Sequence, residues 1–260
     1  MKVVILAGGY GTRISEESHL RPKPMIEIGE MPILWHIMKY YSCFDMNEFI
    51  ICCGHKGYMI KEYFADYFLR RSDVTFDFVN GGKMHVHANV SEPWKVTLVD
   101  TGADTQTGGR IKRVRSYVGD ERFMLTYGDG LSNVNLKELL AVHERGQSVL
   151  TLTGIQPGGR FGVLDINERD GSIVGFQEKA KKDGGWINGG FMVAEAALFD
   201  YIENDRSVLE RKPMERLSAE HKLDVYKHHG FWQCMDTTRD RFALESLWES
   251  QEAKWKIWED

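Results

Sequence analysis

Short apolar runs alternate with segments of helical periodicity along the first 155 residues, and this alternation constrains the fold most strongly. Five apolar runs predict strands: 2–7, 48–54, 95–100, 122–130 and 148–155. Four intervening segments predict helices: 32–44, 58–69, 109–118 and 136–146. Strands separated by helices of this length form βαβ units. We therefore expect an α/β, Rossmann-like fold with a mainly parallel sheet and helices on both faces.

The pattern changes after about residue 155. Segment 161–179 predicts two short strands around the turn signal Arg169-Asp170-Gly171. Segment 223–236 predicts one more strand, and 237–251 predicts a closing helix. The chain shows no internal repeat and no Pro/Gly/Ser-rich linker. We expect a single domain, residues 1–260, with a small C-terminal sheet-and-helix elaboration.

Composition excludes several classes of protein. Hydrophobic residues make up 42% of the 260 residues, which is ample for a globular core. No apolar run approaches the roughly 18 residues that cross a bilayer, and Met1-Lys2 leads directly into a strand rather than into a signal peptide. The net charge of -5 offers no electrostatic footprint for nucleic acid. We expect a protein that binds neither membranes nor nucleic acid.

The four cysteines, at positions 43, 52, 53 and 234, lack CxxC spacing. A thiolate metal site is therefore not expected. We expect buried thiols of a protein that resides in the reducing cytoplasm.

A glycine-rich loop follows the first predicted strand directly. Its glycines are Gly8, Gly9 and Gly11, and glycine after a strand lets the backbone approach a bulky anion. The spacing matches neither a Walker A loop nor the G-x-G-x-x-G fingerprint, because position 14 is Ile. On the glycines alone the signal is weak, and the alternative is an ordinary turn between strand and helix.

Two cations near the loop strengthen the interpretation as a phosphate site. Arg13 lies beside the loop, and Lys23 stands between Pro22 and Pro24. Prolines restrict the backbone on both sides of the lysine, so its stem is anchored on a stiff segment. A stiffly held cation near a glycine-rich loop suits phosphate neutralisation, whereas the alternative is a solvated loop lysine.

These motifs resemble the signature of sugar-1-phosphate nucleotidylyltransferases. The family's usual form is LAGGxGTRL…PKPM, and this chain has LAGGYGTR (6–13) and RPKPM (21–25). The resemblance continues, in the family's order, through YGDG (127–130), FQEK (176–179), INGGF (187–191) and WQCMDTTRD (232–240). One departure is Ala180, where the family has proline after the lysine, so the backbone beside Lys179 is less restricted.

The resemblance implies a reaction. An oxygen of a sugar 1-phosphate attacks the α-phosphorus of a nucleoside triphosphate, and pyrophosphate leaves. Longer stretches, such as FIICCGHKGYMIKEYF (49–64), resemble the branch of the family that uses CTP and glucose 1-phosphate. Alternatives are dTTP or UTP as the nucleotide, another sugar 1-phosphate, or a sensor that binds nucleotide sugars without turnover. The family also implies a homo-oligomer, either a trimer or a hexamer.

The resemblance also assigns site residues by position. The nucleotide would lie against residues of the loop and of two later segments, namely Leu6, Ala7, Gly8, Gly9, Gly11, Thr12, Arg13, Lys23, Thr105, Arg110 and Asp129. Three cations would be catalytic: Arg13 on the β- and γ-phosphates, Lys23 at the reacting centre, and Lys179 on the sugar phosphate. The sugar-phosphate site would comprise Glu178, Lys179, Asn188 and Gly189. Residues 1–155 would then form the nucleotide-binding part, and 156–260 the sugar-binding part.

Mg²⁺ is the implied cofactor, held by Asp129 and Asp236. This hard cation takes one or two carboxylates and completes its shell with phosphate oxygens and water. The two aspartates can meet only through the fold, so their pairing comes from the resemblance and not from spacing. The alternative for each aspartate is a turn or helix N-cap role.

Overall fold

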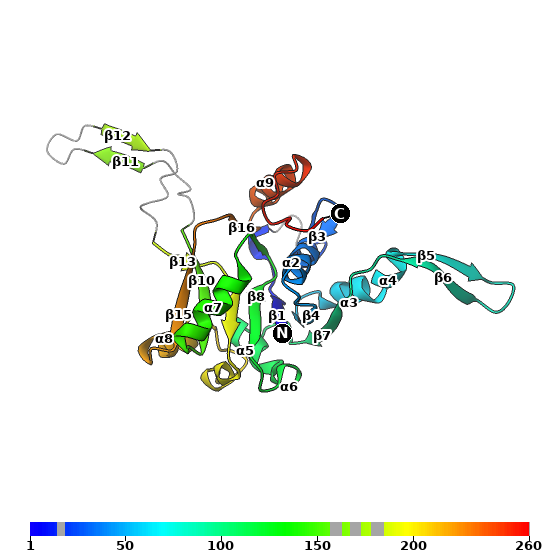
Figure 1. Ribbon diagram of the computed structural model, residues 1–260, viewed down its shortest axis with the longest axis horizontal. Helices are drawn as coiled ribbons and strands as arrows, with labels where there is room; N and C mark the ends of the chain where they lie inside the picture. Colours follow the sequence, from blue (N-terminus) through cyan, green and yellow to red (C-terminus); the bar gives the residue numbers. More distant parts are fainter. Residues whose placement is uncertain (15–18, 157–162, 167–172, 178–184, 260) are drawn as a thin grey trace.

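The computed structural model describes residues 1–14, 19–156, 163–166, 173–177 and 185–259 (Figure 1). Its main element is an eight-stranded sheet in the order β13-β10-β14-β8-β1-β4-β7, with β15 also paired to β10. Its strands are β1 (Lys2–Ala7), β4 (Glu48–Cys53), β7 (Lys95–Asp100), β8 (Phe123–Tyr127), β10 (Leu150–Ile155), β13 (Ile187–Asn188), β14 (Met192–Ala194) and β15 (Leu223–His228).

The sheet is mainly parallel. Strand β1 pairs in parallel with both β4 and β8, β4 with β7, and β10 with β15. Strand β14 is antiparallel to both of its neighbours, β8 and β10. The expected α/β fold with a mainly parallel sheet is confirmed.

Successive residues of β1 face opposite sides of the sheet, and both sides are covered. Val3 and Ile5 belong to a core that includes Ile33 of α2 (Ile33–Ser42) and also residues of α7 (Leu136–Gly146) and α9 (Thr238–Glu249). Val4 and Leu6 belong to a second core formed with α5 (Thr107–Arg113), α6 (Arg115–Val118), η3 (Ala196–Tyr201) and α8 (Lys212–Ala219). Helices therefore lie on both faces, and burial on both sides explains why β1 is continuously apolar.

Several predicted elements are divided in the structure. Segment 58–69 forms α3 (Gly57–Ala65) and α4 (Tyr67–Arg70), and segment 109–118 forms α5 and α6. Segment 122–130 forms β8 and then turns into β9 (Gly130–Ser132), and segment 223–236 forms β15 and β16 (Trp232–Cys234). The expected strand pair within 161–179 is present as β11 (Val163–Ile166) antiparallel to β12 (Ile173–Gln177).

A long hairpin, β5 (Ser72–Asp77) with β6 (Lys83–Asn89), extends from the body beyond α4 (Figure 1). It was not predicted, and most of its side chains are exposed. Short elements complete the fold: η1 (Thr12–Ile14), η2 (Lys23–Met25), β2 (Glu27–Ile28) and β3 (Met31–Pro32). Among the described helices, none combines the length and apolarity needed to cross a membrane.

Candidate active site

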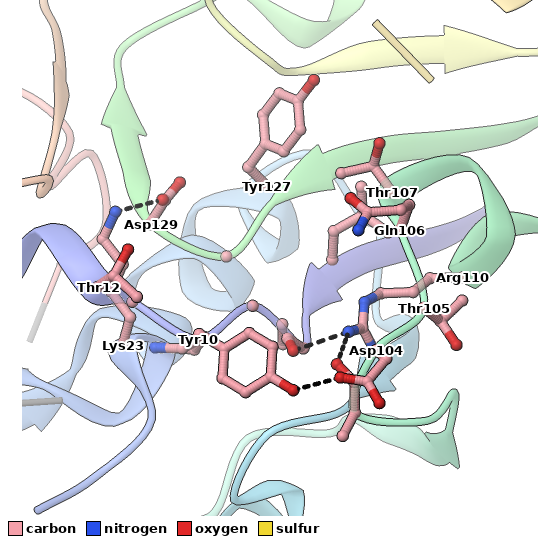
Figure 2. A pocket seen from close by; sticks show the side chains of 18 of the residues that line it. Tyr10, Thr12, Lys23, Asp104, Thr105, Gln106, Thr107, Arg110, Tyr127 and Asp129 are labelled. Carbon is pink, nitrogen blue, oxygen red and sulfur yellow. Dashed lines mark hydrogen bonds and ion pairs between the residues drawn. The ribbon is translucent and has the colours of Figure 1, made fainter. Parts of the chain in front are cut away.

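A cavity of about 600 Å³ opens at the carboxyl ends of β1 and β8 (Figure 2). Parallel α/β sheets place their ligands at this edge. The predicted residues that line it are Leu6, Ala7, Gly8, Gly9, Gly11, Thr12, Lys23, Thr105, Arg110, Asp129 and Asp236. Segments far apart in the sequence thus meet at one cavity.

Lys23 joins the two aspartates of the site. Its ammonium donates to Asp129 Oδ2 and to Asp236 Oδ1, each at 2.6 Å. Only 11% of the Lys23 side chain is exposed. Burial alone would lower the pKa of Lys23, but the Asp129 and Asp236 carboxylates outweigh it, so the pKa is raised. Lys23 is a buried ammonium with two charged partners and not a solvated loop lysine.

The backbone explains how the aspartates meet. Strand β16 pairs with β9 antiparallel, and the Met235 amide donates to the Asp129 carbonyl at 2.8 Å. Asp129 and Asp236 therefore lie on adjacent chain segments. Helix α9 is capped by Thr237, in a reciprocal capping box with Asp240. The N-cap alternative for Asp236 is therefore wrong, and its carboxylate binds Lys23 instead.

The donor set at this point fits a hard divalent cation. Two carboxylates from separate segments converge on one positively charged group, which shows that the pair can hold positive charge between them. No group of three or more potential ligands occurs among the described residues. A site with two protein carboxylates leaves positions for phosphate oxygens and water, as Mg²⁺ prefers.

Arg110 is a buried guanidinium that holds the floor of the cavity together. Only 4% of it is exposed. It donates to the Gly8 carbonyl at 2.9 Å and to the Ala103 carbonyl at 3.0 Å, and its other acceptors are Cys53 O, Thr101 Oγ1 and Gly102 O. Burial lowers the pKa of Arg110. It thus ties the glycine loop to the ends of β4 and β7, a role that sequence reasoning did not assign.

Gly8 is required by this packing. A Cβ on Gly8 would lie 2.2 Å from Arg110 Nη1, so any side chain here would displace the guanidinium. Gly128 is restricted similarly, because its Cβ would lie 3.0 Å from the Leu6 carbonyl. Gly8 and Gly128 are therefore needed for close packing of the cavity walls, in addition to any contact with a ligand.

We expect Arg110→Met to destabilise the protein without any ligand. The change removes the charged donor from five carbonyl or hydroxyl acceptors, three of them in buried hydrogen bonds, and we estimate a cost of about 3 kcal/mol. For a chain of this size, roughly 2–4 °C of Tm is lost per kcal/mol. Thermal melting of the nucleotide-free protein measures the loss. Arg115→Met, which removes an exposed arginine paired with Asp200, is the control and should melt close to wild type. An unchanged Tm for Arg110→Met would show that Arg110 has no structural role.

Two tyrosines of the cavity were not predicted. Tyr10 donates to Asp104 Oδ1 at 2.5 Å and so links the glycine loop to segment 103–107 (Figure 2). Tyr127 donates to Glu210 at 2.5 Å and accepts from Asn188 Nδ2 at 3.1 Å. Tyr10 occupies the variable position of the LAGGxGTR motif, and the Tyr127 partners are distant in sequence. No sequence signal therefore pointed to these contacts.

Other predicted residues lie elsewhere. Asn188 contacts Tyr127 rather than lining the cavity, and the Gly189 carbonyl accepts from Trp232 Nε1 at 2.7 Å. Glu178 and Lys179 lie outside the described residues, as does the Arg13 side chain. Their assigned roles stay predictions.

The cysteines are free thiols. Cys52 and Cys53 are buried as expected, and Cys234 is partly buried. Cys43 is exposed, so the expectation of a buried thiol is wrong there. It lies just past the end of α2, where the helix leaves the core.

Comparison with known families places the chain. A family model described as nucleotidyl transferase matches residues 2–256. The chain belongs to this family. As a nucleotidyl transferase it shows the sequence signature at the cavity itself, since the glycine loop, Lys23, Asp129 and Asp236 all line it.

Individual similar proteins align with nearly the full length of this nucleotidyl transferase. Glucose-1-phosphate cytidylyltransferase of Salmonella typhimurium is 54% identical over 260 residues, 100% of both chains. The probable glucose-1-phosphate cytidylyltransferase of Bacillus subtilis is 43% identical over 259 residues, covering 99% of this chain and 100% of the relative. The crystal structure of HddC from Yersinia pseudotuberculosis aligns with a TM-score of 0.69 at 22% identity, over 95% of this chain and 99% of that one. At that identity the structural match supports the fold alone.

Proposed function

We propose that the protein transfers a cytidylyl group from CTP to α-D-glucose 1-phosphate, giving CDP-glucose and pyrophosphate. The observation that carries the proposal is the 54% identity over the full length to a glucose-1-phosphate cytidylyltransferase. The cavity supports the reaction class, because it joins a glycine loop, a buried ammonium and two carboxylates. In this proposal residues 1–155 supply most of the nucleotide site, and 156–260 supply the sugar site.

The nucleotide phosphates would bind along the glycine loop. Gly8 to Gly11 present backbone without side chains between them except at Tyr10, and Arg110 fixes the loop from behind through the Gly8 carbonyl. Lys23 would neutralise charge at the α-phosphorus, and Arg13 would hold the β- and γ-phosphates. Preorganised cations of this kind stabilise the charge that develops on the leaving pyrophosphate.

The sugar 1-phosphate would approach from the side of β13. Lys179 would bind its phosphate, with Glu178, Asn188 and Gly189 around the sugar. Asn188 is held by two hydrogen bonds, donating to Tyr127 Oη at 3.1 Å and accepting from the Gly190 amide at 2.9 Å. Because Tyr127 lines the nucleotide cavity, this contact supports a position of the sugar site directly beside it.

Asp129 and Asp236 would hold Mg²⁺. When bound, the ion neutralises phosphate charge and orients the phosphate oxygens. The β9–β16 pairing and the capping of α9 support this proposal, because they hold the two aspartates on adjacent chain segments.

The protein is further proposed to act in the cytoplasm as a homo-oligomer, a trimer or a hexamer. The β5–β6 hairpin supports self-association. Val74 with Val86 and Phe76 with Met84 form directly paired rows on one face, and Phe76, Met84 and Val86 are 45%, 44% and 43% exposed. An exposed apolar face on a two-stranded arm suits contact with another subunit.

We expect CTP to give the highest kcat/KM in a pyrophosphate-release assay with α-D-glucose 1-phosphate and Mg²⁺. The panel comprises CTP, UTP and dTTP, each with several sugar 1-phosphates. A higher kcat/KM with UTP or dTTP would show the base assignment to be wrong while leaving nucleotidyl transfer intact. Binding without turnover for every pair would favour the sensor and contradict the proposed function.

A further inference from the structure

The ammonium of Lys23 lies between the two carboxylates that are proposed to hold metal. Its Nζ is 2.6 Å from Asp129 Oδ2 and 2.6 Å from Asp236 Oδ1. The aspartate side chains are 31% and 20% exposed, so the three groups share a partly dehydrated corner of the cavity. The Lys23 ammonium thus partly neutralises both carboxylates.

The carboxylates are the fixed members of this cluster. Asp129 and Asp236 are joined through the Met235-to-Asp129 backbone bond, and the Asp236 amide donates to Asp240 Oδ2 at 3.1 Å within the α9 cap. Lys23 has a stiff backbone in η2, but its ammonium is carried on a flexible four-carbon stem. The ammonium is therefore the group that can move out of this cluster.

An ammonium and a divalent cation compete for one carboxylate pair. Both are positive and would lie at nearly the same point, where they repel strongly. The same cavity contains the glycine loop, on which the nucleotide phosphates would lie. Phosphate oxygens bound there would offer charged acceptors to which the ammonium can transfer its hydrogen bonds.

We propose that Lys23 is the resident counter-ion of Asp129 and Asp236, and that nucleotide phosphates draw it away and so free the carboxylate pair for a divalent metal. The inference rests on the proposed function, since it takes these carboxylates as the metal ligands. Two consequences follow. The nucleotide-free protein binds divalent metal weakly. Metal and nucleotide also increase each other's affinity, because both favour the arrangement in which Lys23 has left the two aspartates.

The test is a titration of the nucleotide-free protein with Mn²⁺, in which the electron paramagnetic resonance signal measures the concentration of free Mn²⁺. We expect Lys23→Met to bind Mn²⁺ at least about tenfold more tightly than wild type, because the competing ammonium is gone while the stem is retained. Lys23→Gln should behave in the same way and serves if the Met variant folds poorly. Lys95→Met removes the same charge from an exposed pair with Glu48 and should bind Mn²⁺ as wild type does.

A further variant locates the metal. Lys23→Met combined with Asp236→Asn should lose the gain in affinity. If that gain persists, the Mn²⁺ lies elsewhere and the proposal fails. Equal Mn²⁺ affinity of wild type and both folded Lys23 variants would likewise overturn it. The Mn²⁺ titration uses no substrate, so it is independent of the activity assay. If the Lys23 variants do not gain Mn²⁺ affinity but the wild type releases pyrophosphate, only the counter-ion role is refuted. A wild type inactive with every substrate pair refutes the proposed function instead.

Discussion

Lys23→Ala is expected to lower kcat/KM by about 10²–10³, the usual range for removing a charge-stabilising group from a preorganised site. The variant loses the cation at the reacting centre and the two ion pairs that Lys23 makes with Asp129 and Asp236. Steady-state pyrophosphate release with CTP and glucose 1-phosphate measures the loss.

The same variant should also lose some thermal stability. Its two charge-assisted hydrogen bonds lie in a partly buried corner, and we estimate a cost of about 1–3 kcal/mol. Activity is therefore compared below the melting transition of the variant. Lys95→Ala is the control, because the Lys95 side chain is 74% exposed and its ammonium pairs with Glu48. Near-normal turnover by a folded Lys23→Ala protein would contradict the catalytic role of the lysine.

Asp129→Asn and Asp236→Asn are each expected to reduce turnover by about 10³-fold or more, the upper end for groups that organise charge at a reacting centre. Each change keeps the shape of the side chain and its ability to accept from Lys23, but removes one negative charge from the proposed Mg²⁺ site. Asp200→Asn removes the same charge from an exposed pair with Arg115 and should have little effect.

The double variant distinguishes one shared ion from two separate roles. If both carboxylates hold the same Mg²⁺, the double variant should be little worse than the poorer single variant, because residues that act as a unit are strongly non-additive. Losses that multiply would show independent roles. Since Thr237 caps α9, any loss in Asp236→Asn cannot be attributed to a missing helix cap.

Local patterns were enough to predict the sheet and the glycine loop. The run KVVILA is apolar at every position but the first, as a strand covered on both faces must be, and β1 lies near the centre of the sheet. The loop, Lys23 and the YGDG turn converge because parallel strands bring their carboxyl ends to one edge. Their meeting was therefore predictable from strand order and motif together.

Contacts made across the fold were not predictable in this way. The resemblance assigned Arg110 to nucleotide binding, and only its bonds to the carbonyls of Gly8, Gly102 and Ala103 show that it joins two loops. The hairpin β5–β6 was missed because its side chains mix polar and apolar types with no flanking signal as strong as those of the core strands. Two long predicted helices are split in the structure. Asp66 lies between α3 and α4, and Val114 lies between α5 and α6.

Strand β14 has a consequence for how the chain is made. It lies between β8 and β10, yet it is synthesised after both. Residues 1–155 contain the four neighbouring strands β8, β1, β4 and β7 and also β10, but not the strand that joins β10 to the other four. The cluster of Lys23, Asp129 and Asp236 is completed later still, because Asp236 follows β14 in the sequence. A nascent chain therefore cannot assemble this cluster before Asp236 has left the ribosome.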